Sequence, residues 1–205
     1  MRPRLHLTLL AIVAGVLVWS GIGPKDRLTW FLEVFPVLIG AAILLPTYRR
    51  FRLTDLLYVL LAIHAVILMI GGHYTYAEVP LFDWIRDQFG FARNHYDRVG
   101  HLAQGFVPAI LAREILIRRG VVRGRGWLFF IVVSICLGFS AFYELIEWSV
   151  AELSGEAAEA FLGTQGDDWD TQKDMAMALV GSVLAQVLLG RTHDRQLKAN
   201  REAST

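Results

Sequence analysis

Carboxylates and imidazoles lie close to the ends of three apolar stretches in the C-terminal half of the chain. They form pairs three or four residues apart, which are Asp97 with His101, Glu144 with Glu147, and Asp170 with Asp174. Residues at this spacing share one face of a helix, and such pairs on facing helices can build a metal site inside a bundle. Carboxylates joined by one or two imidazoles suit Zn²⁺, Mn²⁺ or Fe²⁺ better than Ca²⁺. The pattern therefore predicts a divalent-metal site.

Each residue type has an expected task at such a site. We predict four metal ligands, which are His101, Glu144, Asp170 and Asp174. A bound metal lowers the pKa of a water molecule, and a nearby carboxylate can accept the proton that the water loses. Glu147 and Asp97 are the candidates for this catalytic general base. Four further residues could take part as ligands, supporting acids or charge partners, namely His73, Asp167, Arg98 and Lys173. Arg93, with Arg98 and Lys173, could also hold a phosphate group.

Two other interpretations stay open for the same residues. One is a metal-free polar network in which basic neighbours neutralise the acids, and the other is a proton or ion pathway. Asp170 is a natural helix N-cap, and Asp174 lies one turn further on, where the helix dipole still favours an acid. The dipole disfavours Glu144 and Glu147, because they lie at the C-terminal end of their stretch. Glu33, about one turn inside another apolar stretch, is a further candidate for the cluster.

The elements that must position these residues are six apolar stretches, each close to the roughly 20 residues that cross a bilayer. Their approximate ranges are 5–23, 28–46, 53–72, 98–117, 127–150 and 171–190. They predict an all-α fold, a polytopic membrane helical bundle that forms one domain over residues 1–205, with 191–205 as a cytoplasmic tail. Residues with small side chains between 178 and 185 predict a close helix contact.

The distribution of Lys and Arg predicts the orientation of the bundle. Basic residues concentrate in the two termini and in the segments "TYRRFR" and "IRRGVVRGRG", and such segments stay on the cytoplasmic side. Both termini should therefore be cytoplasmic, and the acidic pairs should face outward. Between the third and fourth stretches, "LFDWIRDQFGFA" predicts a short helix in the outer membrane interface, or a lid packed on the bundle.

Composition excludes several classes of protein. Hydrophobic residues make up 55% of the chain and charged residues only 19%, whereas a soluble domain has about 25% charged residues. The net charge of +1 argues against a nucleic-acid partner. The single cysteine, Cys136, excludes a disulfide framework and a cysteine metal site. The lipid bilayer is the expected partner, and the bacterial cytoplasmic membrane the expected location.

Four motifs resemble those of the YjdF-type family of predicted bacterial inner-membrane proteins. They are "HYTYAEVPLFDWIRDQF", "HYDRVGHLAQGF", "YELIEW" and "GTQGDDWDTQKDM". The C-terminal half is also remotely similar to the VanZ-like group, with Ala178 where that group usually has an asparagine. The resemblance implies a multi-pass membrane architecture and implies no particular activity.

Two functional hypotheses follow from the residues. The first is a metal-dependent hydrolase or transferase that acts on a lipid or lipid-linked substrate of the cell envelope. The second is a non-catalytic envelope scaffold, or an ion-handling or metal-sensing membrane protein. The position of the acids at one end of the bundle, away from the midplane where transporters bind their cargo, argues against simple transport.

Overall fold

The computed structural model describes residues 3–154 and 164–202. The described residues form seven helices and no strand, which confirms the predicted all-α fold. The helices are α1 (Pro3–Ser20), α2 (Arg27–Thr47), α3 (Asp55–Tyr74), α4 (Pro80–Phe89), α5 (Tyr96–Arg119), α6 (Arg125–Ser154) and α8 (Asp170–Glu202).

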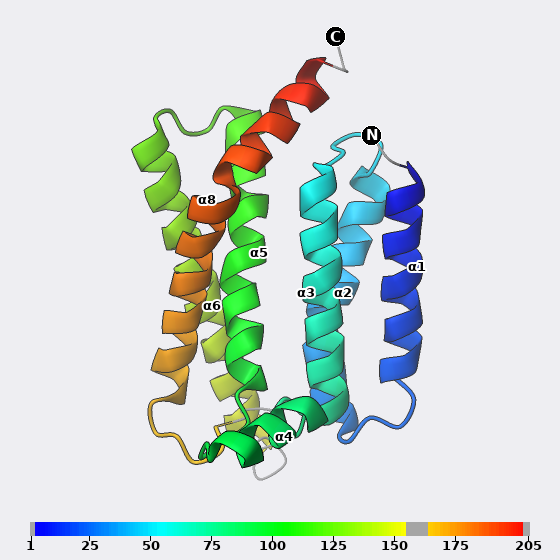
Figure 1. Cartoon of the computed structure of the whole chain (residues 1–205), viewed down its shortest axis with the longest axis vertical. Coiled ribbons are helices and arrows are strands. Elements are labelled where there is room, and N and C mark those ends of the chain that lie inside the picture. The colour runs from blue at the N-terminus through cyan, green and yellow to red at the C-terminus, as the bar shows by residue number, and fades with distance from the viewer. Residues whose placement is uncertain (1–2, 155–163, 203–205) are drawn as a thin grey trace.

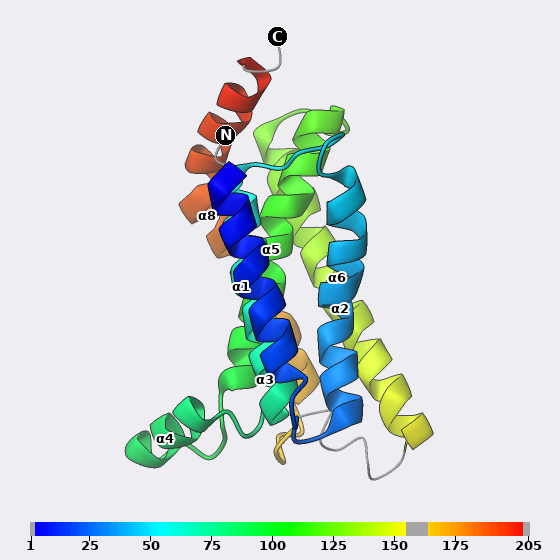
Figure 2. The same cartoon turned by 90° about the vertical axis from the view of Figure 1, so that its right-hand side faces the viewer.

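The long helices stand side by side in two groups (Figure 1). Helices α1, α2 and α3 form one group, α5, α6 and α8 form the other, and α3 packs on α5 between them. Helix α1 begins and helix α8 ends at the same end of the bundle, which we call the terminal end. The opposite end holds the predicted acidic pairs, and we call it the acidic end. Helix α4 lies across the acidic end and projects beyond the bundle (Figure 2).

Four of the helices are long and apolar enough to cross a membrane, namely α2, α3, α6 and α8, and α1 is a shorter apolar helix. Helix α5 is more polar because it carries ionisable residues at both of its ends. It buries them against its neighbours, and Asp97, His101, Arg113 and Glu114 are all buried. The count of six spans and the cytoplasmic placement of the termini stay predictions.

Several helix boundaries differ from the predicted ones. Helix α8 continues to Glu202 instead of ending at Gly190, so the part of the predicted tail that the structure describes is helical. The reason is a buried face beyond the apolar stretch, since His193 and Leu197 are almost completely enclosed. Helix α6 likewise runs to Ser154 instead of residue 150.

Helices α5 and α8 make the closest contact in the bundle. A Cβ atom added to Gly105 would lie 1.8 Å from the backbone oxygen of Ala178, and one added to Gly181 would lie 2.2 Å from the backbone oxygen of Leu102. Only glycine permits this approach of two backbones. The contact confirms the predicted role of the small residues in α8, and it fixes the register between the acidic ends of α5 and α8.

Candidate metal centre

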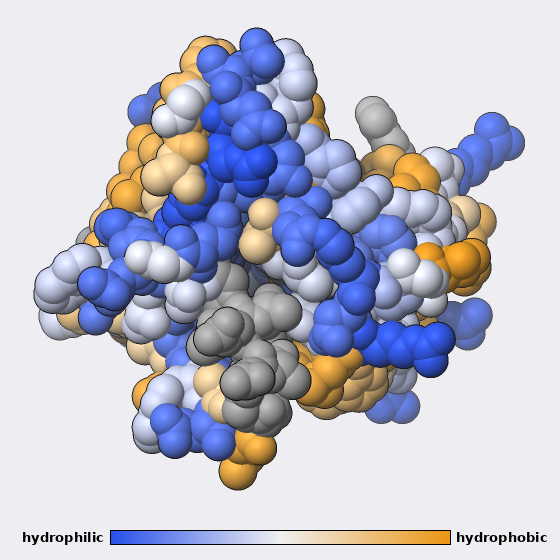
Figure 3. Space-filling model, turned by 90° about the horizontal axis from the view of Figure 1, so that it is seen from below, coloured by the Kyte–Doolittle hydropathy of each residue, from blue (hydrophilic) through white to orange (hydrophobic). Residues whose placement is uncertain are grey.

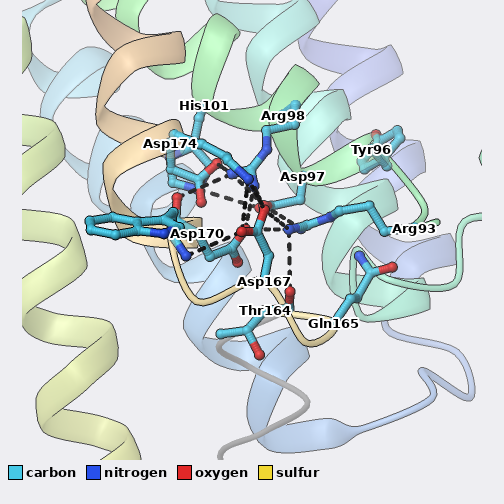
Figure 4. A network of polar contacts seen from close by, with 12 residues as sticks. Arg93, Tyr96, Asp97, Arg98, His101, Thr164, Gln165, Asp167, Asp170 and Asp174 are labelled. Atoms are coloured by element: carbon cyan, nitrogen blue, oxygen red, sulfur yellow. Dashed lines mark hydrogen bonds and ion pairs between the residues drawn. The ribbon is translucent and has the colours of Figure 1, made fainter. Parts of the chain in front are cut away.

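The polar cluster lies at the acidic end, where α5 and α8 begin and α6 ends. Figure 4 shows side chains from the first turns of α5 and α8, and from the segment before α8, pointing toward one another. Seen from below, this end of the molecule is largely hydrophilic (Figure 3).

Three residues of the cluster could hold a metal ion together. Asp97 and His101 from α5 and Asp174 from α8 each offer one ligand atom, and these atoms lie within 4.8 Å of one another. His101 Nε2 lies 3.4 Å from Asp97 Oδ1 and 3.8 Å from Asp174 Oδ1. All three residues are buried. Ligands about 2.0–2.2 Å from one ion are at most about 4.4 Å apart, and both distances from His101 Nε2 are within that limit.

A glutamine orients the His101 ring. The ring nitrogen Nδ1 lies 3.1 Å from Gln104 Oε1, and an amide oxygen can only accept a hydrogen bond. Nδ1 therefore carries a proton, and Nε2 is the ring nitrogen that faces Asp97 and Asp174. Metal-bound histidines are usually held in this way. Sequence reasoning missed Gln104, although its position three residues after His101 placed it on the same helix face.

Helix α6 presents Glu144 and Glu147 to the cluster, and both are buried. Glu144 Oε1 lies 3.8 Å from His101 Nδ1 and has no hydrogen-bond partner among the described residues. A buried carboxylate oxygen without a donor is costly, so this atom is available to a ligand. Glu147 interacts electrostatically with Glu144, His101 and Glu33. Glu33 of α2 is also buried and accepts a hydrogen bond of 3.3 Å from the Tyr143 hydroxyl.

Two arginines already bind the carboxylates of α8. Arg98 donates hydrogen bonds to Asp170 and Asp174, and at 3.2 Å to Asp167. Arg93 donates to Asp170 and, at 3.3 Å, to Asp97 (Figure 4). Asp170 thus lies between two guanidinium groups. Asp170 is not among the residues whose ligand atoms converge, and its contacts suit a charge partner for the arginines better than a metal ligand.

The segment before α8 is clamped to the start of α5. The amide of Gln165 accepts a hydrogen bond of 2.9 Å from the backbone N–H of Asn94 and donates one of 3.0 Å to its carbonyl oxygen. Gln165 and Gly166 adopt positive φ angles of 48° and 80°, a conformation that glycine adopts without strain. The segment "TQGDDWD" thereby turns the chain so that Asp167 and Asp170 face the arginines.

The rim of the cluster is more exposed. Lys173 Nζ lies 2.6 Å from Asp167 Oδ2, and this hydrogen bond lowers the pKa of the Asp167 carboxyl below its ordinary value. Asp168 is exposed. Among the residues named as possible additional contributors, Asp167, Arg98 and Lys173 therefore join one contact network.

His73 is the predicted candidate that lies elsewhere. Its Nδ1 bonds the backbone oxygen of Ser20 at 3.0 Å, and its ring lies 4.5 Å from the ring of Trp19. These contacts join the end of α3 to the end of α1. The structure does not bring His73 to the group formed by Asp97, His101 and Asp174.

The cluster carries more negative than positive charge. Six carboxyl groups are buried at this end, those of Glu33, Asp97, Glu144, Glu147, Asp170 and Asp174. They face the guanidinium groups of Arg93 and Arg98 and the His101 imidazole. If all six carboxyl groups were ionised, even a protonated His101 would leave three negative charges without a cation among these residues. Buried carboxylates need compensation by protons or a bound cation.

Comparisons with known proteins cover this whole region. The sequence model of a family described as "Predicted membrane protein (DUF2238)" matches residues 5–195. The chain is 48% identical over 198 residues to the Escherichia coli (strain K12) protein named "Inner membrane protein YjdF", which covers 97% of this chain and 95% of that protein. No solved structure matches the chain.

Proposed function

The chain belongs to the DUF2238 family of predicted membrane proteins, and we propose that its acidic end is the divalent-metal centre of a membrane hydrolase or transferase. The family assignment agrees with the resemblance noted from the four motifs, and the protein is a multi-pass protein of the inner membrane. The substrate we propose is a phosphate-bearing lipid or lipid-linked molecule of the outer leaflet.

The observation that carries this proposal is the convergence of Asp97, His101 and Asp174 in a buried site. They come from two helices whose backbones are in contact through Gly105 and Gly181, so the site is held by rigid elements. Two carboxylates and one imidazole, which would bind an ion through Nε2 after loss of its proton, are a donor set that suits Zn²⁺, Mn²⁺ and Fe²⁺. Glu144 has a buried oxygen without a hydrogen-bond partner among the described residues, and it would serve as a fourth ligand if its side chain turned from His101 Nδ1 toward Nε2.

The roles of the acids change slightly from the sequence-based assignment. Asp97, expected as a possible base, is better suited to bind the ion, because its carboxylate lies next to His101 Nε2. Asp170 is better suited to hold the two arginines. Glu147 forms no ion pair with an arginine or lysine among the described residues, and we keep it as the candidate general base. A bound divalent ion would supply a Lewis acid and a water of lowered pKa, and Glu147 would accept the proton.

The arginines give the proposal its substrate class. Arg93 and Arg98 lie beside the three converging residues, and a guanidinium pairs well with the oxygens of a phosphate. A cation that occupied Asp97 and Asp174 would compete with these arginines for the carboxylates. Arg98 could then turn toward a substrate phosphate. The site lies at the end of the bundle. If this end meets the lipid headgroups, as the apolar spans predict, a lipid could reach the site without leaving the membrane.

A second candidate function rests on the same arginines. Because Arg98 donates to Asp170 and Asp174, and Arg93 to Asp170 and Asp97, the cluster could be a metal-free network that ties α5 to α8. The protein would then be a non-catalytic envelope scaffold. Buried ion pairs of this kind contribute more to a defined arrangement than to net stability.

Turnover in proteoliposomes distinguishes the two functions. The purified full chain is incubated with phosphatidylglycerol and with an undecaprenyl pyrophosphate substrate, either with Mn²⁺ and Zn²⁺ or with EDTA, and phosphate and headgroup release are measured. We expect release that depends on metal and that Glu147→Gln abolishes while the variant still binds metal. The control is Glu152→Gln, an exposed glutamate in α6. No release from either lipid, with metal bound, would favour a structural or sensing role.

A further inference from the structure

The terminal end of the bundle holds an open cavity of about 340 Å³ that is lined mainly by basic side chains. It lies between the last turn of α5, the start of α6 and the extension of α8 beyond Gly190. Five cations surround it, namely Arg125, Arg191, Arg195, Lys198 and Arg201. Ile117 and Leu197 supply apolar lining, and Asp194 is the acid of the lining.

The cations of α8 lie on one face of the helix. Arg191, Arg195 and Lys198 follow one another at intervals of four and three residues, and Arg201 comes three residues later. Like charges at this spacing repel one another and destabilise a helix. Among the described residues, no ion pair joins any of these side chains to a carboxylate. Asp194 is already engaged, because its Oδ1 accepts a hydrogen bond of 2.8 Å from Arg113.

A buried network holds this helix face in place. Arg113 Nη1 lies 2.9 Å from His193 Nδ1, and because a guanidinium can only donate, Nδ1 accepts the bond. His193 Nε2 therefore carries the proton and donates to Glu114 Oε2 at 3.0 Å. The side chains of His193 and Glu114 are fully enclosed. These contacts anchor α8 to α5 beside the cavity, so the cations on this face of α8 stay close together.

Two features place the cavity at the depth of lipid headgroups. Trp127 follows Arg125 in the first turn of α6, and its side chain is largely exposed, as is typical of tryptophans at a membrane interface. The last turns of α8 extend past the ends of α5 and α6 (Figure 1). Arg125 also begins α6, and the N-terminus of a helix attracts anions.

We propose that this cavity binds a phosphate group, supplied by the headgroup of an anionic phospholipid or by a free phosphate ion.

The test uses the delipidated full chain in a neutral detergent and measures binding by native mass spectrometry. One arm adds phosphatidylglycerol, with phosphatidylcholine for comparison, and the other adds inorganic phosphate. The test variant is the double substitution Arg195→Gln/Lys198→Gln. Its matched control is Arg49→Gln/Arg50→Gln, which removes two exposed cations from the segment after α2, outside the cavity.

We expect the wild type and the control to bind phosphatidylglycerol equally, and the test variant about 10- to 30-fold more weakly, since each cation near a membrane surface contributes about 1 kcal/mol. Binding of inorganic phosphate with the same dependence on Arg195 and Lys198 would support the site and identify a soluble phosphate as its source. Equal weakening in test and control variants, or no binding in either arm, would overturn the proposal.

Discussion

Gly105 of α5 lies against Ala178 of α8 so closely that a methyl group at residue 105 would come within 1.8 Å of the Ala178 backbone oxygen. The contact lies one turn from His101 in α5 and one turn from Asp174 in α8. The geometry of the candidate metal centre therefore depends on a glycine that contributes no functional group to it.

Gly105→Ala should destabilise the protein by about 1–3 kcal/mol, because the backbone atoms that it meets can move only if the helices separate. For a chain of this size, that is a fall of about 2–12 °C in the melting temperature measured in detergent. Gly138→Ala in α6 is the control, since a Cβ there meets nothing within 4 Å. Equal melting temperatures for the two variants would mean that α5 and α8 are not packed as described.

Arg98→Gln should destabilise the chelator-treated protein by about 3–5 kcal/mol, because it leaves the Asp174 carboxylate buried without its guanidinium partner. If the cluster binds a divalent ion, added Mn²⁺ should stabilise this variant more than the wild type, since the ion no longer competes with Arg98. Melting curves with and without Mn²⁺ measure both effects. Arg86→Gln on the surface of α4 is the control and should change little. A variant that Mn²⁺ does not stabilise would favour the metal-free network.

Gln104→Leu should weaken metal binding by about 10- to 100-fold, because the His101 ring loses the acceptor that fixes its tautomer. Gln104→Glu keeps an acceptor at the same position and should retain tight binding. Competition with a fluorescent chelator gives the two affinities. Equal affinities for the leucine and glutamate variants would show that His101 Nε2 is not a ligand.

Glu114→Gln should destabilise the terminal end without any effect on metal binding. The Glu114 carboxylate accepts hydrogen bonds from Thr54, Arg118 and His193, and an amide in its place would turn a donor toward at least one of these donors. The expected cost is about 1–3 kcal/mol, measured by thermal unfolding beside the exposed control Glu202→Gln. Loss of bound metal in a folded Glu114→Gln protein would contradict the separation of the two ends.

The sequence predicted the helical architecture and the place where the acids gather. Pairs such as Asp97 and His101 have the period of a helix, and antiparallel helices of similar length bring their ends to one depth. The rotation of each helix about its axis could not be predicted in the same way. His73 turns toward Ser20 of α1, whereas its neighbour Gly72 lies close to Glu33 of α2.

The remaining differences depend on contacts between segments far apart in the chain. Helix α8 passes Gly190 because His193 finds a buried partner in Glu114, 79 residues away. Arg93 reaches Asp170 because Gln165 clamps its segment to Asn94. The spacing of residues within one helix does not reveal a partner in another helix. These pairs could be identified only once the packing of α5 on α8 was known.

The metal content of the purified protein tests whether Asp97, His101 and Asp174 bind a divalent ion. The wild type, Asp174→Asn and His101→Ala are purified in detergent without chelator, beside Asp168→Asn, which changes an exposed carboxylate in the segment before α8. Metals per chain are then counted by inductively coupled plasma mass spectrometry. We expect about one divalent ion in the wild type and in Asp168→Asn, and its loss from the two other variants while they remain folded. A wild type without metal, even after dialysis against Zn²⁺ and Mn²⁺, would contradict this expectation.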